Sequence, residues 1–99
     1  MSPGAWPDVP YFDWMTAMSS AQNSHGGQEM TTMGLYATMM HWGAIIVAPG
    51  YTDPIQYKAG GNPYGVSVTA NGEPIPDDVQ EAIRHQARRL VAMAEKLAR

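Results

Sequence analysis

The spacing of apolar positions predicts a helix over residues 28–42. These positions recur at intervals of three and four, which places them on one stripe of an amphipathic helix. The stripe consists of Met30, Met33, Ala37 and Met40. Gly43 is suited to end the helix. Methionine at this spacing is typical of core filling. A copper site built with His41 is the alternative, and it is disfavoured because no cluster of soft ligands converges at metal spacing.

A second group of patterns predicts strands and a long connection. The uninterrupted apolar run over residues 44–48 indicates a buried strand, because a parallel sheet covered on both faces needs apolar side chains on each face. Residues 49–76 are rich in proline and glycine and predict a connection without regular structure, apart from a short edge strand at residues 66–69. Residues 11–18 alternate poorly, so either a strand or a short helical turn is expected there.

The C-terminal residues 77–98 predict a second long helix. Its apolar face is expected to carry Val79, Ile83, Gln86, Leu90, Met93 and Leu97. Three arginines, Arg84, Arg88 and Arg89, are expected on the solvent side. Glu81 and Glu95 lie within reach of them along the helix, so this basic face predicts ion pairs rather than a phosphate site.

Composition narrows the classes of function. With 99 residues, the chain forms one domain at most, and 44% hydrophobic against 15% charged residues is typical of a packed protein. A net charge of −3 argues against nucleic acid or an anionic membrane as the main partner. The chain has no cysteine, so we expect no thiolate metal site. No signal peptide or bilayer-length apolar run is visible, which favours a cytoplasmic location.

The N-terminal arm, residues 1–18, differs in composition from residues 19–99. Its prolines favour an extended or turn-rich conformation. It is also aromatic, with Trp6, Tyr11, Phe12 and Trp14. Aromatic rings normally bury themselves against something, and two possibilities stay open: packing on the same domain or docking onto a partner chain.

The stretch Ser19–Glu29 is a polar, glycine-bearing loop that opens the first helix. Free backbone N–H groups at such a position can bind an anion or the polar edge of a ligand. Helix capping and turn formation also explain the same residue types.

Four blocks of sequence together carry a family resemblance. They are HGGQE, HWGAIIVAPGY, AGGNPYGVSVT and the charged C-terminal helix, in this order. The chain resembles, roughly over residues 19–98, the C-terminal half of the flavodoxin-like NAD(P)H:quinone oxidoreductases of the WrbA type. This resemblance implies an α/β fold, half of a doubly wound parallel sheet. We expect the first half of the family domain to be absent, and the sheet to be completed by self-association or by a partner chain.

The resemblance also implies a cofactor. Flavodoxin-like proteins bind FMN at the carboxyl ends of parallel strands, and the family passes electrons from NAD(P)H to quinones through it. By position, the expected flavin-contacting residues are Ala21, Gln22, Asn23, Ser24, His25, Gly26 and His41. The family loop corresponding to residues 49–76 contributes to subunit contacts and to the mouth of the flavin site. His41 has a second explanation, as a histidine at the negative end of the helix dipole. No catalytic residue and no metal ligand is identified.

Three functions remain open at this point. The chain is an FMN-binding oxidoreductase subunit, an oligomeric scaffold without flavin, or a partial product without activity. The first requires that another segment supply a phosphate cradle near Ser24–Gly27, and the second is favoured if Tyr11–Met18 crosses the place of the flavin ring. We expect the isolated chain to be an oligomer that binds FMN weakly or not at all.

Overall fold

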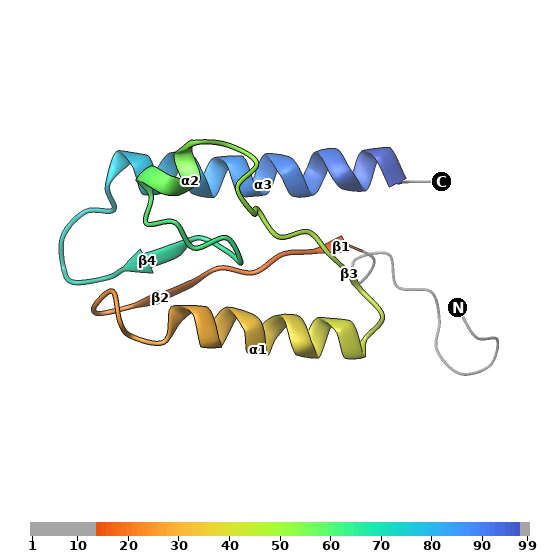
Figure 1. The fold of residues 1–99 in the computed structure, drawn as a ribbon, viewed down its shortest axis with the longest axis horizontal. Helices are drawn as coiled ribbons and strands as arrows, with labels where there is room; N and C mark the ends of the chain where they lie inside the picture. The colour runs from red at the N-terminus through yellow and green to blue at the C-terminus, as the bar shows by residue number, and fades with distance from the viewer. Residues whose placement is uncertain (1–13, 98–99) are drawn as a thin grey trace.

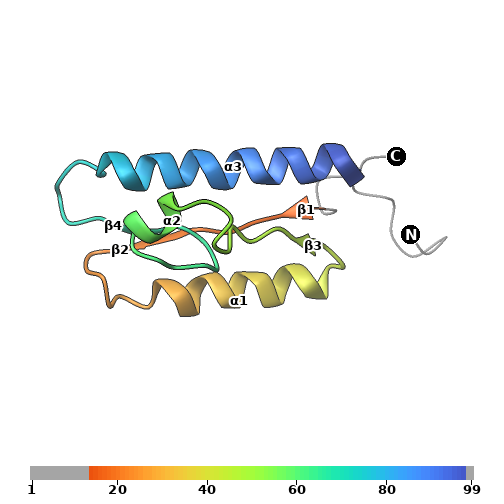
Figure 2. The ribbon, with the colours of Figure 1, turned by 45° about the horizontal axis from the view of Figure 1, so that its top comes forward.

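Two long helices enclose a layer of short parallel strands in the computed structural model, which describes residues 14–97. Helix α1 covers one face of the strands and helix α3 covers the other (Figures 1 and 2). In chain order the elements are β1 (Trp14–Met15), β2 (Ser19–Ala21), α1 (Gln28–His41), β3 (Ile45–Ile46), α2 (Ile55–Lys58), β4 (Ser67–Thr69) and α3 (Asp77–Leu97). This α/β arrangement is compatible with part of a flavodoxin-like fold.

Strands β1 and β2 belong to one extended segment, residues 14–21, which we call the central segment. β1 pairs in parallel with β3, and β2 pairs in parallel with β4. The Met15 carbonyl accepts from the Val47 N–H at 2.8 Å, and the Ser19 N–H donates to the Val66 carbonyl at 3.2 Å. Successive residues of a strand present their backbone groups to opposite edges. Because both residues are odd-numbered, β3 and β4 lie end to end along the same edge of the central segment.

Two buried side chains fill the gap between β3 and β4, opposite Ala17. The hydroxyl of Tyr36, from α1, accepts from the Ala17 N–H at 3.3 Å. The side-chain amide of Gln86, from α3, donates to the Ala17 carbonyl at 2.7 Å and accepts from the Val66 N–H at 2.9 Å. Tyr36 is 3% exposed and Gln86 is 0% exposed. These groups take the place of a backbone partner, since buried N–H and C=O groups must be satisfied.

Between β3 and β4, the chain leaves the sheet over residues 48–65, a segment that we call the excursion. A hydrogen bond of 2.8 Å from the Gly50 N–H to the Pro63 carbonyl closes the base of this excursion. Gly65 brings the chain back so close that a Cβ there would lie 2.1 Å from the Ala17 oxygen. Only glycine fits at that crossing. The edge strand expected at residues 66–69 is confirmed as β4.

The sequence-based prediction of a connection without regular structure was wrong for the excursion. It contains the short helix α2, which packs against α3. The Asp53 side chain accepts a hydrogen bond from the Ile55 N–H at 2.9 Å, and this contact lies at the start of the helix. A helical turn of this length is stabilised by tertiary contacts rather than by a repeating apolar pattern, so the pattern did not reveal it.

The prediction for the buried face of α1 was also wrong. The methionine stripe lies at the surface, with Met30 79%, Met33 44% and Met40 60% exposed. The buried positions are Gln28, Thr32, Tyr36 and Met39. Polar contacts to the central segment orient this helix, including a 3.1 Å hydrogen bond between the hydroxyls of Thr32 and Ser19. The apolar periodicity therefore marks a surface stripe instead of the core.

Helix α3 agrees well with the sequence. Gln86 is fully buried and the other expected apolar positions from residue 79 to 93 are partly buried. Glu81 pairs with Arg84 at 2.9 Å and with Arg88 at 2.7 Å, as expected. Arg89 differs from the prediction, because its Nε donates to the Ala48 carbonyl at 3.1 Å instead of lying free in solvent.

The N-terminal arm is described only at its end. Trp6, Tyr11 and Phe12 lie outside the described residues, whereas Trp14 is half-buried within β1. The strand alternative for residues 11–18 is thus observed at Trp14–Met15. No helix within residues 14–97 combines the length and hydropathy needed to cross a bilayer.

We expect Tyr36→Phe to destabilise the protein. The variant removes the hydroxyl that binds Ala17 and the Tyr64 carbonyl, and unsatisfied buried groups cost about 1–3 kcal/mol. Tyr57→Phe is the matched control, because that ring is 64% exposed and keeps its stacking on Tyr51. Urea unfolding measures both, and equal losses in the two variants would contradict the role given to Tyr36.

We expect the protein to lose a small part of its stability in acid, when Glu81 becomes protonated. Hydrogen bonds from Arg88 and then Arg84 hold the pKa of Glu81 below its ordinary value of 4.5. A lowered folded-state pKa stabilises the fold above pH 4.5, and this contribution is lost as the pH falls through the lowered pKa. The urea midpoint of Glu81→Gln should therefore lie below that of the wild type near neutral pH and converge with it in acid. A difference independent of pH would contradict this.

Candidate functional site

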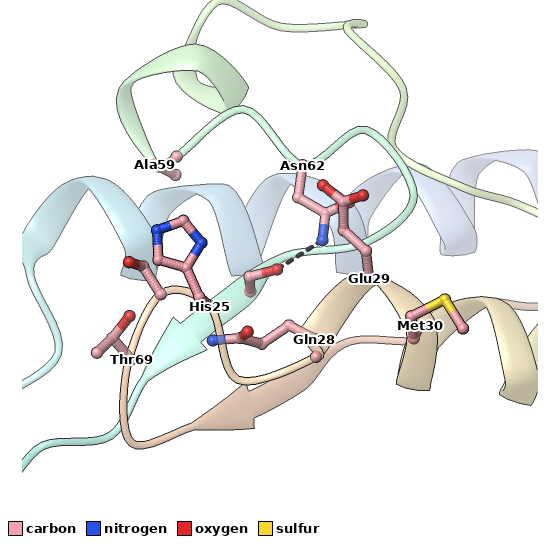
Figure 3. A pocket seen from close by; sticks show the side chains of 11 residues that line it. His25, Gln28, Glu29, Met30, Ala59, Asn62 and Thr69 are labelled. Atoms are coloured by element: carbon pink, nitrogen blue, oxygen red, sulfur yellow. Dashed lines mark hydrogen bonds between the residues drawn. The ribbon is translucent and has the colours of Figure 1, made fainter.

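A hollow of about 440 Å³ lies where β2 and β4 end, beside the first turn of α1. Figure 3 shows His25, Asn62 and Glu29 gathered around it, with Ala59 and Thr69 on the side of α2 and β4. The lining residues are Ser24, His25, Gly27, Gln28, Glu29, Met30, Ala59, Gly60, Asn62, Ser67 and Thr69. In parallel α/β sheets, ligands bind outside the carboxyl ends of the strands, and this hollow has that position.

The loop that follows β2 is shaped by its own side chains. The Asn23 side-chain oxygen accepts from the His25 N–H at 2.9 Å, which forms a local turn. Gln28, which is 5% exposed, donates from Nε2 to the Asn23 carbonyl at 2.8 Å and accepts on Oε1 from the Gly26 N–H at 3.1 Å. Gln28 thereby joins both ends of the loop to the start of α1.

Two glycines make the turn into α1 possible. A Cβ at Gly26 would lie 2.3 Å from the Cβ of Ala21, so a larger residue would displace the loop from β2. Gly27 has a φ of 85° and precedes the helix without a side-chain cap. The first N–H groups of an α-helix have no partner within the helix. Here they are left beside the hollow without a capping side chain.

The opposite wall comes from the excursion. Asn62 is 7% exposed, and its side chain donates to Ser67 Oγ at 2.5 Å and accepts from the Tyr64 N–H at 3.0 Å (Figure 3). The side-chain amide of Gln56 donates to the Asn62 carbonyl at 2.8 Å. These contacts hold the Gly60–Asn62 turn against β4 and fix the width of the hollow.

The structure brings together some of the expected flavin-contacting residues. Ser24 and His25 line the hollow. Ala21, Gln22, Asn23 and Gly26 belong to the same strand end and loop. His41 ends α1, and a helix of 14 residues is about 20 Å long, so His41 lies well away from the hollow within this chain. Flavin contact by any of these residues stays a prediction.

Residue-by-residue reasoning did not single out the lining contributed by Ala59, Gly60, Asn62, Ser67 and Thr69. The turn cluster Gly60–Gly65 was the available signal. It could not show which wall the turn would form, because that depends on the pairing of β4 with β2. The long-range register places Thr69 opposite Ala21.

The chemistry of the hollow suits binding better than acid–base catalysis. Glu29 is its charged residue, and neither lysine nor arginine lines it. Among residues 14–97, no group of three His, Cys, Asp or Glu side chains is placed to hold a metal ion. Hydroxyl, amide and imidazole groups can hydrogen-bond the polar edge of a neutral ring. The volume falls within the roughly 300–1,000 Å³ that small-molecule sites occupy.

Gly26→Ala should disturb the loop that forms the hollow. The added Cβ meets the Ala21 side chain, and such overpacking costs about 1–3 kcal/mol. Gly34→Ala is the control, because a Cβ there meets nothing within 4 Å and alanine favours a helix by up to about 1 kcal/mol. Urea unfolding should move in opposite directions for the two variants. A Gly26→Ala protein as stable as the wild type would contradict the close approach.

Comparison with known proteins gives a consistent set of relatives, although no family model matches the chain. A Deinococcus radiodurans protein named NAD(P)H dehydrogenase (quinone) is 57% identical over 82 residues, covering 83% of this chain and 41% of the relative. Proteins of the same name from Sinorhizobium fredii and Methanosarcina acetivorans are 36% and 34% identical, each covering 84% of this chain. The matches span 45% and 43% of those relatives.

The chain therefore spans less than half the length of the curated relatives it matches. The match leaves more than half of each relative's length without an aligned segment in this chain of 99 residues. The similarity covers 83–84% of this chain, so it extends well beyond the loop or any one helix.

Proposed function

We propose that this chain, which corresponds to the C-terminal part of the NAD(P)H dehydrogenase (quinone) family, provides the flavin-ring side of an FMN site in a flavodoxin-like oxidoreductase. The observation that carries the proposal is the position of the hollow. It lies at the carboxyl ends of parallel strands and is lined by Ser24 and His25, which the family resemblance had indicated.

FMN, when bound, supplies the electron transfer from NAD(P)H to a quinone, and the protein supplies position and hydrogen bonds. Ser24, Asn62 and Thr69 would offer hydroxyl and amide groups to the polar edge of the ring. His25 would cover the ring from the loop, since its side chain lies over the hollow in Figure 3. The backbone N–H groups at the start of α1 would favour electron density on the facing edge.

The phosphate of FMN has no matching group here. Glu29 lies at the hollow, and no cationic side chain among the lining residues offsets it. Phosphate oxygens favour arginine, lysine or a cradle of several N–H groups. We infer that the phosphate anchor belongs to polypeptide outside these 99 residues. The complete activity, the cytoplasmic location and the use of NAD(P)H and quinone are parts of the same proposal.

A comparison of riboflavin with FMN tests the ring-binding role. Riboflavin lacks the phosphate, so the chain alone should bind it weakly and at least as well as FMN. Repulsion between the phosphate and Glu29 in an exposed site should weaken FMN binding by no more than about fivefold. Quenching of flavin fluorescence during titration with purified protein measures both affinities. FMN binding that is much tighter than riboflavin binding would show a phosphate site and contradict the assignment.

Histidine variants complete this test. His25→Ala should weaken riboflavin binding by about two- to tenfold, the effect of losing one polar contact. His85→Ala is the matched control, because His85 contacts Thr52 and does not line the hollow. If both substitutions weaken riboflavin binding equally, the flavin ring does not bind beside His25. His41→Ala reports separately on the family-derived contact at the end of α1.

The second candidate is an oligomeric scaffold without flavin. The exposed methionine stripe of α1 and the uncompensated carboxylate of Glu29 favour it. One argument for it was that Tyr11–Met18 would cross the place of the flavin ring. Residues 11–13 lie outside the described residues, and this argument weakens because none of residues 14–18 lines the hollow. If neither riboflavin nor FMN binds the chain, alone or in its completed assembly, the scaffold function replaces the first proposal.

A further inference from the structure

The central segment has a second edge, formed by its even-numbered residues. Its odd-numbered residues are satisfied: Met15 by β3, Ser19 by β4, and Ala17 by Tyr36 and Gln86. The backbone groups of the even-numbered residues point the other way. Among residues 14–97, none provides a backbone partner for the N–H and C=O groups of Thr16, Met18 and Ser20.

Within the part of the chain that the structure describes, this edge lacks the features that protect natural edge strands. Such strands usually carry charges, proline, a bulge or a covering segment. The sequence from Trp14 to Ala21, WMTAMSSA, has no charged residue and no proline. Met18 is 37% exposed, and Ser20 is exposed beside it. The open backbone groups are therefore accessible to another strand.

The environment of the segment is that of an interior strand. Ser19 contacts α1 through Thr32, and Thr16 contacts α3 through Gln86 at 2.8 Å as well as α1 through Tyr36 at 3.5 Å. Both faces are thus covered by helices, as for strands within a parallel sheet. The indole N–H of Trp14, at the start of the segment, is buried and has no acceptor among residues 14–97. A strand that is covered on both faces but paired along only one edge belongs to a sheet that lacks a neighbouring strand.

We propose that the open edge at Thr16, Met18 and Ser20 binds a parallel β-strand from polypeptide outside these 99 residues. That polypeptide is equivalent to the part of the relatives that the chain does not match. More than half of each relative is available for this role, since the matches span 41–45% of their lengths. A second copy fits less well, because a two-fold axis at this edge would pair the segments antiparallel.

Strand addition here would act through the backbone. Main-chain hydrogen bonds would give the affinity, and the side chains beside Met18 would give selectivity. The parallel pairs β1–β3 and β2–β4 set the direction of the added strand. This inference does not require flavin binding, because sheet completion and ring binding use different residues.

The probe is the unmatched N-terminal segment of the Deinococcus radiodurans relative, expressed as a separate polypeptide and mixed with the full chain. We expect an equimolar complex by light scattering after size-exclusion chromatography. Hydrogen exchange, read residue by residue, should slow at Thr16, Met18 and Ser20 by roughly a hundredfold or more on complex formation. The Ser19 N–H, already bonded to Val66, serves as the internal reference within the same strand.

Met18→Lys is the corresponding variant, because lysine is a residue that natural edges use against strand addition. It should weaken the complex about tenfold or more. Ile75→Lys is the control: Ile75 is 40% exposed and lies in the connection after β4, which holds the opposite edge. If Met18→Lys fails to fold, the hydrogen-exchange comparison on the wild-type chain still decides.

Three outcomes would overturn the inference: no complex, a complex that leaves the three amides unprotected, or protection in a homodimer of the chain alone. Flavin titration is a separate readout. A protected edge without flavin binding would preserve this inference and reject the proposed function. Flavin binding by a chain whose edge amides stay unprotected would preserve the proposed function and reject this inference.

Discussion

The hydrogen bonding of the central segment is the constraint on which the rest of the structure depends. Residues 14–21 touch each of the other strands, and both long helices pack against them. At Ala17 the paired strand is interrupted, and the side chains of Tyr36 and Gln86 satisfy the backbone in its place. These hydrogen bonds at Ala17 therefore join α1, α3 and the sheet. A small domain with few buried apolar side chains relies on such polar contacts more than a large one.

The interruption at Ala17 also creates the hollow. Because the partner strand is split into β3 and β4, residues 48–65 leave the sheet and return as the Gly60–Asn62 turn. This turn faces the loop after β2, and the two walls enclose a polar space beside the start of α1. The same parallel pairing that positions the hollow leaves the far edge of the central segment without a backbone partner among the described residues. The proposed ligand site and the proposed strand-binding edge are thus separate consequences of one arrangement.

Much of the fold was predictable where a segment carries its own signal. Helix α3 repeats one apolar face over many turns, and its position and the Glu81 ion pairs follow from local spacing. The strand at 44–48 was expected, but regular pairing is limited to Ile45–Ile46. The family resemblance predicted that the loop after β2 contacts a flavin. Ser24 and His25 of this loop line the hollow, and flavin contact itself stays a prediction.

The sequence by itself indicated the two long helices, the polar loop after β2 and the resemblance to the quinone dehydrogenase family, because these depend on contacts between neighbours and on blocks of residues in order. Only the tertiary structure decided which face of α1 is buried, that α2 exists, and that Asn62 and Thr69 complete the hollow. The methionine periodicity was misleading because hydrogen bonds between the central segment and the side chains of Thr32 and Tyr36 orient α1. Such contacts join residues that are distant in sequence, so their effect arises only once the chain has folded.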